Sequence, residues 1–541
     1  MSGDLGVLYA DSLHRATTRL DGSLGALSPQ VAPQDADACL RPVRNALERQ
    51  LRQAVLPVVC GELARARQAR VLRGATPEER YRDFWDRETL TPELLAKRYP
   101  VVASEIEVIA TTTVDAVVHA ARSLARDIEA LSGELPDARG RLLDVNPVGS
   151  DRHAGGRQVI SLGFDGGRVY YKPVSLASAD LLHRFVELAG VPSELWPGRL
   201  RTVDRGGYGW LEEAKFRPCT EVSQVRRFWR RCGVLLAVCC LLNFTDGHFE
   251  NLVAAGEHPV LVDTETLFQN YAWRSRGGRL ASVVDTGLVQ HAGPAAPPSG
   301  MTSAFQVMGG GRLSSLSPAA DGEGTDTMAV RFQRTLHEPP VNLPVLASRF
   351  QTVDGYVEEL VDGFRTVFSL CRQRRNEILG DSEFWDRAAA HESRQIIRET
   401  RYYVRLLRLT EQPDYAVSPA RAEHMITDWL RFEEPDNRYN TLVADEVAAL
   451  KGFDIPYFGH RVSGVALASA SAEHAGFFPT SALTQIRGNI SDWDEPFVDA
   501  QCALLRENLS VPPGDTALSP MDERLLDQLT HRRHPAAAGP E

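Results

Sequence analysis

Three polar side chains with the spacing of a phosphoryl-transfer site follow an apolar helical run. They are Asp246, His248 and Asn251; two short apolar runs come next, joined by Gly256-Glu257-His258, and Asp263 follows the second run. In enzymes that transfer a phosphoryl group, an Asp accepts the proton of the attacking hydroxyl, an Asn five residues later binds Mg²⁺, and a hairpin supplies a second metal-binding Asp. The stretch therefore predicts phosphoryl transfer.

The elements upstream predict the phosphate-binding half of such a site. A strand at Leu142–Val148 is followed by a polar glycine-bearing turn at Gly149–Gly156. Two further strands, at Arg157–Phe164 and Arg168–Pro173, are joined by Asp165-Gly166-Gly167. Such turns let backbone N–H groups approach phosphates, and a Lys on the last strand neutralises them. Lys172 is one of only four lysines among 60 basic residues. Alone, the turn would more often be an ordinary β-turn and the Lys a solvated charge, but a matching catalytic loop downstream favours phosphate binding.

The connection between the two halves is expected to contact the nucleotide. A helix at Leu176–Ala189 and a strand pair within Leu200–Lys215 lead to a long helix at Val222–Leu242, which ends at the catalytic loop. The backbone around Trp210-Leu211-Glu212 is then the expected contact for adenine. The candidate nucleotide-binding residues are Lys172, Asp151, His153, Arg157 and Glu212.

These elements predict an α+β protein with a lipid-kinase-like, bilobal fold, since Asp-x-His-x-x-Asn is closer to the catalytic loop of lipid-kinase-like enzymes. Residues 1–140 have helical periodicity, at Val43–Arg73 and Ser104–Leu131, and predict a helical N-terminal extension. A packed extension is favoured there, and a peptide-docking surface is the alternative. We expect an N-lobe at 141–221 and a C-lobe with helical additions at 222–541.

Two stretches of the C-lobe suggest contacts with a peptide. Residues 269–330 are rich in Gly, Ser, Pro and Ala and lie where a kinase has its activation segment, so a mobile lid or peptide-binding loop is favoured over disordered filler. A helix is predicted at His391–Leu409, with arginines at three- and four-residue steps: Arg394, Arg398, Arg401, Arg405 and Arg408. Such a stripe is usually solvated or paired with carboxylates; the alternative is an anion site for a peptide-borne phosphate.

Composition and charge limit the class of protein. At 541 residues, 43% hydrophobic and 24% charged, the chain is long enough for two or three lobes of a globular protein. A net charge of −11 implies no general affinity for nucleic acid. No signal peptide is evident, and the longest apolar run, Gly233–Leu242, has about half of the ~20 residues that a membrane span needs. Eight cysteines without metal-site spacing suit a reducing cytoplasm.

A set of short motifs along the chain matches one known family. They are Tyr99-Pro100-Val101-Val102-Ala103, Ser150-Asp151-Arg152-His153 with Gly156-Arg157, Tyr171-Lys172-Pro173, Gly209-Trp210-Leu211-Glu212, Thr245–Asn251, His258–Phe268, Thr286-Gly287-Leu288 and Asp454-Ile455-Pro456-Tyr457-Phe458. With these motifs the chain resembles the dehydratase domain of class II lanthipeptide synthetases, the type 2 lantibiotic biosynthesis proteins. The resemblance extends from the N-terminal helices to near the C-terminus.

The resemblance implies a two-step activity on a ribosomally made precursor peptide. ATP and Mg²⁺ would serve to phosphorylate Ser and Thr, and elimination of the phosphate would leave dehydroalanine or dehydrobutyrine. Lys172 would bind the nucleotide phosphates, and Asp246 would be the base for phosphorylation. Asn251 and Asp263 would hold Mg²⁺, and His248 would orient the phosphoryl group or Asp246.

Elimination is implied to use an Arg and a Thr six residues later, which Arg394 and Thr400 fit; Arg398 lies between them and joins the catalytic candidates. On an unbroken helix this step would leave the two side chains roughly 120° apart. We therefore expect either that a helix starts or bends there, or that they border the leaving phosphate from two sides. A cation can take up the charge of the phosphate, and a polar group can help to move the α-proton.

Full-length synthetases of this family continue into a zinc-dependent cyclase, for which this sequence supplies no ligands. We expect either a dehydratase that works with a separate lanthionine cyclase or a piece of a longer chain. One alternative is a peptide or small-molecule kinase without elimination, which Arg394 and Thr400 argue against. Another is a pseudokinase-like peptide-binding scaffold, which would be free to lose Lys172, Asp246 and the two candidate metal ligands.

Overall fold

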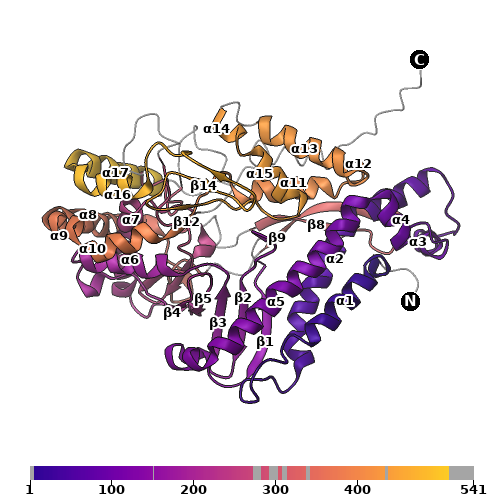
Figure 1. Cartoon of the computed structure of the whole chain (residues 1–541), viewed down its shortest axis with the longest axis horizontal. Helices are drawn as coiled ribbons and strands as arrows, with labels where there is room; N and C mark the ends of the chain where they lie inside the picture. Colours follow the sequence, from indigo (N-terminus) through magenta and orange to yellow (C-terminus); the bar gives the residue numbers. More distant parts are fainter. Residues whose placement is uncertain are drawn as a thin grey trace.

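Helices and small antiparallel sheets build the molecule, as the α+β prediction requires (Figure 1). The computed structural model describes residues 5–149, 152–271, 282–290, 303–306, 314–336, 341–432 and 437–510. There are two large hydrophobic cores: one is built mostly from residues 5–210, and the other from residues 181–509, which precede and follow the catalytic loop. The bilobal, lipid-kinase-like arrangement stays a prediction.

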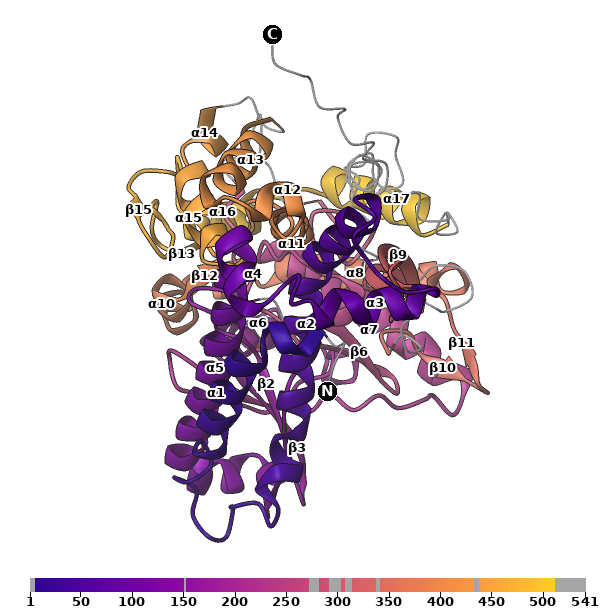
Figure 2. The ribbon, with the colours of Figure 1, turned by 90° about the vertical axis from the view of Figure 1, so that its right-hand side faces the viewer.

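The N-terminal helices surround one of these cores. They are α1 (Ala10–Asp21), α2 (Ala36–Gln68), α3 (Pro77–Asp86), α4 (Pro92–Arg98) and α5 (Pro100–Glu134). The helices predicted at Val43–Arg73 and Ser104–Leu131 are present as α2 and α5. The Asp35 carboxylate caps α2 by accepting the Ala38 N–H, which satisfies one of its free backbone donors. The long helices α2 and α5 lie side by side and cover one face of a sheet (Figures 1 and 2).

That sheet has five antiparallel strands in the order β1-β2-β3-β5-β4. The strands are β1 (Leu142–Pro147), β2 (Ile160–Phe164), β3 (Gly167–Lys172), β4 (Thr202–Asp204) and β5 (Gly209–Glu212). The predicted hairpin turn joins β2 to β3, with Phe164 opposite Gly167. Lys172 ends β3 opposite Gly209 of β5, so the sheet delivers its side chain at one end of two paired strands.

The C-terminal core packs around the helix that leads into the catalytic loop. This helix is α7 (Val222–Leu241), and the helices grouped with it are α6 (Ala177–Leu188), α8 (Val357–Gln373), α9 (Arg375–Gly380), α10 (Ser382–Ala390), α16 (Ala482–Asp492) and α17 (Glu495–Leu509). Helices α7 and α8 cross backbone to backbone. A Cβ atom on Gly233 would lie 1.9 Å from the carbonyl oxygen of Leu360, and one on Gly363 would lie 1.9 Å from that of Arg230.

We expect Gly233→Ala to lower the free energy of unfolding by roughly 3 kcal/mol, because a methyl group there forces the two helix backbones apart. Gly488→Ala is the matched control, since a Cβ atom at this helical glycine of α16 meets nothing within 4 Å. The control should be neutral or slightly stabilising because alanine favours helix. Thermal and urea denaturation measure both variants, and equal stability of the two would contradict the tight crossing.

The arginine-rich stretch is not the single helix predicted at His391–Leu409. It begins with strand β12 (Glu392–Arg394), continues as a loop, and becomes helix α11 only at Thr400–Thr410. Strand β12 forms because it pairs with β13 (Gly459–Arg461), and the sheet continues through β14 (Leu467–Ala468) and β15 (Glu473–His474). Thr400 is therefore the first residue of a helix, which is one of the two arrangements expected for the Arg394 and Thr400 pair.

Helix α11 packs with further helices into a third, smaller core. The other helices of this region are α12 (Pro413–Ala416), α13 (Pro419–Phe432), α14 (Asn437–Asn440) and α15 (Val443–Lys451). Val101 of α5 belongs to the same core, so the helical extension contacts this region directly. In the described part of the chain, no helix combines the length and the apolar character that crossing a membrane would require.

Part of the predicted lid at 269–330 is a hairpin that reaches the helical extension. Strands β8 (Ser314–Asp321) and β9 (Ala329–Leu336) pair over their whole length. At the hairpin tip, Arg80 of α3 donates two hydrogen bonds, of 2.7 and 3.2 Å, to the buried carboxylate of Asp326, and Met328 enters the core around α2. Short strands β10 (Val345–Leu346) and β11 (Arg349–Phe350) follow. Residues 272–281, 291–302 and 307–313 of the predicted lid lie outside the described residues.

Candidate active site

A large open cleft of about 1400 Å³ brings together the catalytic loop, the end of β3 and the start of α11. Its walls include eight of the candidate residues together: His153, Arg157, Lys172, Glu212, Asp246, His248, Asn251 and Asp263. Arg394 and Thr400 line the same cleft. Asp151 lies outside the described residues, and Arg398 is absent from the cleft lining among the residues that the structure describes.

The predicted catalytic loop, Thr245–Asn251, forms a turn, called the catalytic turn below, that is held by close backbone packing. Asp246 has a left-handed backbone (φ 70°), and its carbonyl oxygen accepts the N–H of His248 at 2.8 Å and the side-chain amide of Asn251 at 2.9 Å. Gly247 donates its N–H to the Thr286 carbonyl at 2.8 Å. A Cβ atom on Gly287 would lie 2.7 Å from that same nitrogen, so only glycine fits there. A left-handed non-glycine residue fixed in this way is typical of a functional site.

His248 is a charged group within this turn. Its Nδ1 lies 3.5 Å from the Asp246 carboxylate, and its Nε2 lies 3.3 Å from the Glu250 carboxylate. Burial alone would lower the pKa of His248, but these two acidic partners raise it to about 10. The imidazole is therefore protonated at neutral pH, and its positive charge holds the Asp246 carboxylate in place.

The buried Lys172 side chain forms an ion pair with the half-buried acid that follows the β6–β7 hairpin. Strands β6 (Leu252–Ala255) and β7 (His258–Leu261) place Asp263 just past the hairpin, and the Lys172 ammonium donates to its carboxylate and to the Val262 carbonyl, both at 2.9 Å. Burial would raise the pKa of Asp263, but the Lys172 charge and the Glu265 N–H hold it below its usual value. Asp263 is therefore ionised.

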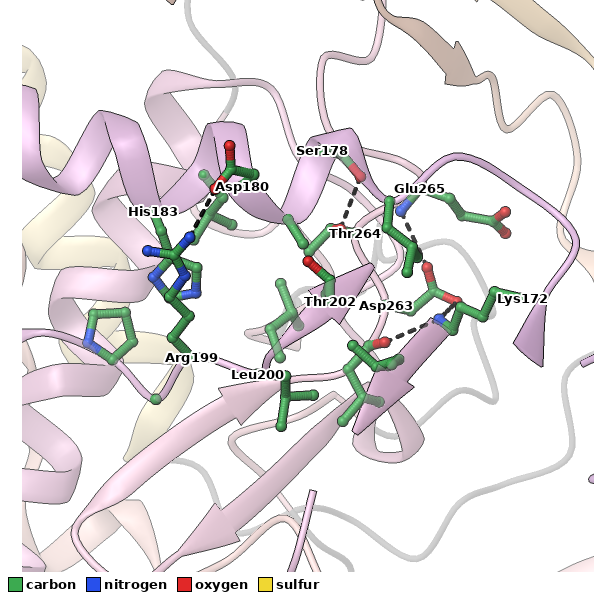
Figure 3. Close-up of a pocket in the computed structure, with 18 of the residues that line it drawn as sticks. Lys172, Ser178, Asp180, His183, Arg199, Leu200, Thr202, Asp263, Thr264 and Glu265 are labelled. Atoms are coloured by element: carbon green, nitrogen blue, oxygen red, sulfur yellow. Dashed lines mark hydrogen bonds and ion pairs between the residues drawn. The ribbon is translucent and has the colours of Figure 1, made fainter. Parts of the chain in front are cut away.

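A small pocket behind Lys172 is too small for a nucleotide (Figure 3). It encloses about 30 Å³, whereas ligand pockets are typically ten times larger or more. Lys172 and Asp263 form one side, and on the other side the Asp180 carboxylate of α6 accepts from Arg199 at 2.7 Å. The two acids of α6 are paired elsewhere, Asp180 with Arg199 and Glu187 with Arg184, so the described part of α6 gives Lys172 no acidic partner. A nucleotide phosphate would reach Lys172 from the large cleft.

Asn251 and Asp263 are chemically suited to Mg²⁺. The Asn251 side-chain nitrogen donates a hydrogen bond to the Asp246 carbonyl. The side-chain oxygen of Asn251 accepts no hydrogen bond from the described residues. Mg²⁺ prefers oxygen ligands and commonly keeps several waters beside one or two protein oxygens and substrate phosphates. No group of three or more His, Cys, Asp and Glu side chains suited to a metal ion occurs in the described ranges. An Asn and an Asp with phosphate oxygens would therefore be the ligand set.

Arg394 enters the cleft from β12 and pairs with an acid that the sequence analysis did not assign. Its guanidinium donates to the Glu265 carboxylate at 2.5 Å, and its backbone N–H donates to the Glu265 carbonyl at 3.0 Å. Burial opposes the charge of Arg394, but Glu265 and the nearby Asp246 raise its pKa above the ordinary value. Burial and the Asp263 charge raise the pKa of Glu265. The spacing Asp-x-Glu after the hairpin was the available signal for this residue.

The glycine-bearing turn is held by a distant carboxylate. The N–H groups of Gly155 and Gly156 both donate to Asp454, the latter at 3.0 Å, so the amides expected to approach phosphates are engaged within the protein. His153 faces Arg394 at 3.5 Å through Nε2, while its Nδ1 contacts the Ile455 carbonyl at 3.1 Å. Burial and then Arg394 lower the pKa of His153 to about 3, so the imidazole is neutral.

The remaining nucleotide candidates lie on the cleft wall without a shared polar contact. Arg157 is exposed there. The Glu212 carboxylate turns back and accepts the Arg201 backbone N–H at 2.7 Å, which fixes β5 beside its neighbouring loop. The structure therefore brings Lys172, Asp263, Glu265 and Arg394 into one connected group and leaves Arg157 and Glu212 apart from it.

Arg398, a predicted catalytic residue, forms a buried ion pair with Glu446 and is not among the described residues that line the cleft. Its guanidinium donates to the Glu446 carboxylate at 2.8 Å and to the Leu430 carbonyl at 3.0 Å, and Tyr403 donates to the same carboxylate at 2.7 Å. The predicted basic stripe is likewise divided among carboxylates, with Arg401 bonded to Glu399. The carboxylate-paired interpretation of the stripe is the one that the structure supports.

We expect Arg398→Met to lower the free energy of unfolding by about 3–5 kcal/mol, because it leaves the buried Glu446 charge without its cation. The double variant Arg398→Met/Glu446→Leu should recover most of this loss, since it removes both charges. Urea denaturation measures the stability of both variants. If the folded double variant lost catalytic activity, Arg398 would act in the chemistry rather than in the fold.

Comparison with known proteins defines the class first. A family model described as a domain of unknown function, DUF4135, matches residues 99–461, and the chain belongs to this family. It is also similar to the Lacticin 481/lactococcin biosynthesis protein LcnDR2 of Lactococcus lactis subsp. lactis, with 24% identity over 440 residues. This match covers 75% of the chain and 46% of that relative, so the chain spans about half the length of the curated relative. All candidate site residues lie within residues 99–461.

Proposed function

We propose that this protein is a lanthipeptide dehydratase, which phosphorylates Ser and Thr of a ribosomal precursor peptide with ATP and then eliminates the phosphate. The observation that carries the proposal is the continuity of charge in one cleft. Lys172 pairs with Asp263, and Arg394 pairs with Glu265 two residues further along the chain. Groups suited to phosphoryl transfer and to phosphate departure thus line the same space. The similarity to a lacticin 481 biosynthesis protein supports this choice of substrate class.

In the first step, Asp246 accepts the proton of the substrate hydroxyl. At the same time the hydroxyl oxygen of the substrate attacks the γ-phosphorus of ATP. The new O–P bond forms as the bond to the β-phosphate oxygen breaks, and ADP leaves. The protonated His248 holds the Asp246 carboxylate in position, and Lys172 balances phosphate charge. Mg²⁺, bound through Asn251 and Asp263, would supply further charge neutralisation.

In the second step, the proton on Cα of the phosphorylated residue passes to a base in the cleft. Its electron pair forms the Cα=Cβ double bond, and the Cβ–O bond breaks with the electrons leaving on phosphate. Arg394 stabilises the departing charge, and the Thr400 hydroxyl at the start of α11 can contact the same group. A protein that carried out only the first step would be a kinase without elimination activity, which is the alternative function.

One assay separates these possibilities. The protein is incubated with ATP, Mg²⁺ and a candidate precursor, a Ser/Thr/Cys-rich peptide sought among the short reading frames beside its gene, and the peptide mass is read over time. Loss of water supports the dehydratase, whereas a stable gain of phosphate identifies a kinase without elimination. An unchanged peptide would sink the proposal in favour of a peptide-binding scaffold.

A further inference from the structure

A short strap, defined here as residues 454–458 between α15 and β13, fixes one wall of the cleft. Asp454 accepts the Gly155 and Gly156 N–H groups, as described above. Ile455 donates its N–H to the Arg152 carbonyl at 2.8 Å, and its own carbonyl contacts the His153 ring at 3.1 Å. The strap therefore holds the glycine-bearing turn in a defined place, and Tyr457 projects from it at the level of Arg394.

The Tyr457 ring packs against both basic groups of this wall. The guanidinium carbon of Arg394 lies 5.4 Å from the ring centroid, within the range of a cation–π contact. The His153 ring meets it edge-on, with centroids 5.9 Å apart. Tyr457 and Glu265 both contact the Arg394 guanidinium, so both limit its movement.

Tyr457 is one of the residues that line the cleft, and no residue in the described part of the chain forms a hydrogen bond with its hydroxyl. Burial, and then the Glu265 carboxylate, raise the pKa of Tyr457 well above the ordinary value. The phenol therefore keeps its proton at neutral pH and is available as a hydrogen-bond donor to an anion.

We propose that Tyr457 is a further catalytic residue, whose hydroxyl donates a hydrogen bond to the phosphate as it leaves the peptide while its ring holds the Arg394 guanidinium. This inference rests on the proposed dehydratase function. Negative charge grows on the phosphate as its Cβ–O bond breaks, so a donor placed there acts more strongly in the transition state than in the bound phosphopeptide. Arg394 shares its charge with Glu265, so a second, uncommitted donor complements it.

The test uses Tyr457→Phe, which keeps the ring and removes only the hydroxyl. Its substrate is the same gene-neighbour peptide, synthesised with phosphoserine, so that elimination is measured apart from phosphorylation. We expect elimination at saturating peptide to slow by about tenfold to a hundredfold, the range for one hydrogen bond to a charged group. The KM for the phosphopeptide and the rate of phosphorylation of the unmodified peptide should stay near wild type.

Tyr208→Phe is the matched control, because it loses a hydroxyl that donates to Asp127 at 3.0 Å outside the cleft lining. It should eliminate phosphate at the wild-type rate. Tyr457→Leu should slow elimination more than Tyr457→Phe, because it also releases the Arg394 guanidinium.

Two results would overturn the assignment. Elimination by Tyr457→Phe at the wild-type rate excludes the hydroxyl, and an equal loss of phosphorylation and elimination shows a purely structural role. Either result, obtained while the wild type dehydrates the peptide, leaves the proposed function intact. A wild-type protein that forms no dehydrated product would instead refute the proposed function, and the inference would fall with it.

Discussion

We expect Asp246→Asn to suppress both the phosphopeptide and the dehydrated product, with phosphorylation slowed by about a hundredfold to ten-thousandfold, the range for loss of a general base. The amide keeps the shape of the turn but cannot accept the substrate proton. The substitution also removes the negative charge that lies 3.5 Å from Nδ1 of His248 in the same turn. Mass spectrometry of the peptide after incubation with ATP and Mg²⁺ measures the effect.

Asp285→Asn provides the matched control for this change. Asp285 lines the same cleft, but its carboxylate accepts the Ser282 N–H at 2.8 Å and, among the described residues, forms no hydrogen bond or ion pair with the catalytic turn. This variant should phosphorylate at a near wild-type rate. Phosphorylation by Asp246→Asn within tenfold of the wild type would show that another group accepts the proton.

Arg394→Lys should convert the protein into a kinase that accumulates phosphopeptide, with elimination slowed by about a hundredfold. A lysine retains the charge opposite Glu265 but loses the planar guanidinium that can bond Glu265 and phosphate at once. Phosphorylation should persist, because the Lys172 pair with Asp263 and the catalytic turn remain. The measurement is the ratio of phosphorylated to dehydrated peptide over time.

Arg401→Lys is the corresponding control, since Arg401 lines the cleft and is bonded to Glu399. It should leave the ratio of phosphorylated to dehydrated peptide unchanged. If Arg394→Lys dehydrated the peptide as fast as wild type, the elimination assignment would be wrong. An equal loss of both steps would instead point to a collapsed cleft.

The features that could be predicted from the sequence are those set by neighbouring residues. The β2–β3 hairpin follows from Asp165-Gly166-Gly167, and the catalytic residues lie within one short stretch with defined spacing. Lys172 stood out because lysine is rare in this chain. Each of these signals depends on local backbone chemistry, so no distant contact was needed to find it.

The errors and omissions come from contacts between distant parts of the chain. Arginine spacing at 394–408 resembled one helix, but β12 forms because Glu392 pairs with Arg461 in β13, far along the sequence. The glycine amides were expected to face phosphate, but Asp454 occupies them. Tyr457 had no assigned role, because only the folded chain brings it to Arg394.

The contact between Arg80 and Asp326 has a consequence for how the chain is made. These residues are separated by 246 positions, and a ribosome working at about 5–20 residues per second needs roughly 12 to 50 seconds to cover that distance. During this interval the N-terminal helices have been made, but the β8–β9 hairpin that packs against them has not, and their core lacks Met328. The N-terminal core therefore stays incomplete until residue 328 has been translated, a period in which a chaperone could bind it.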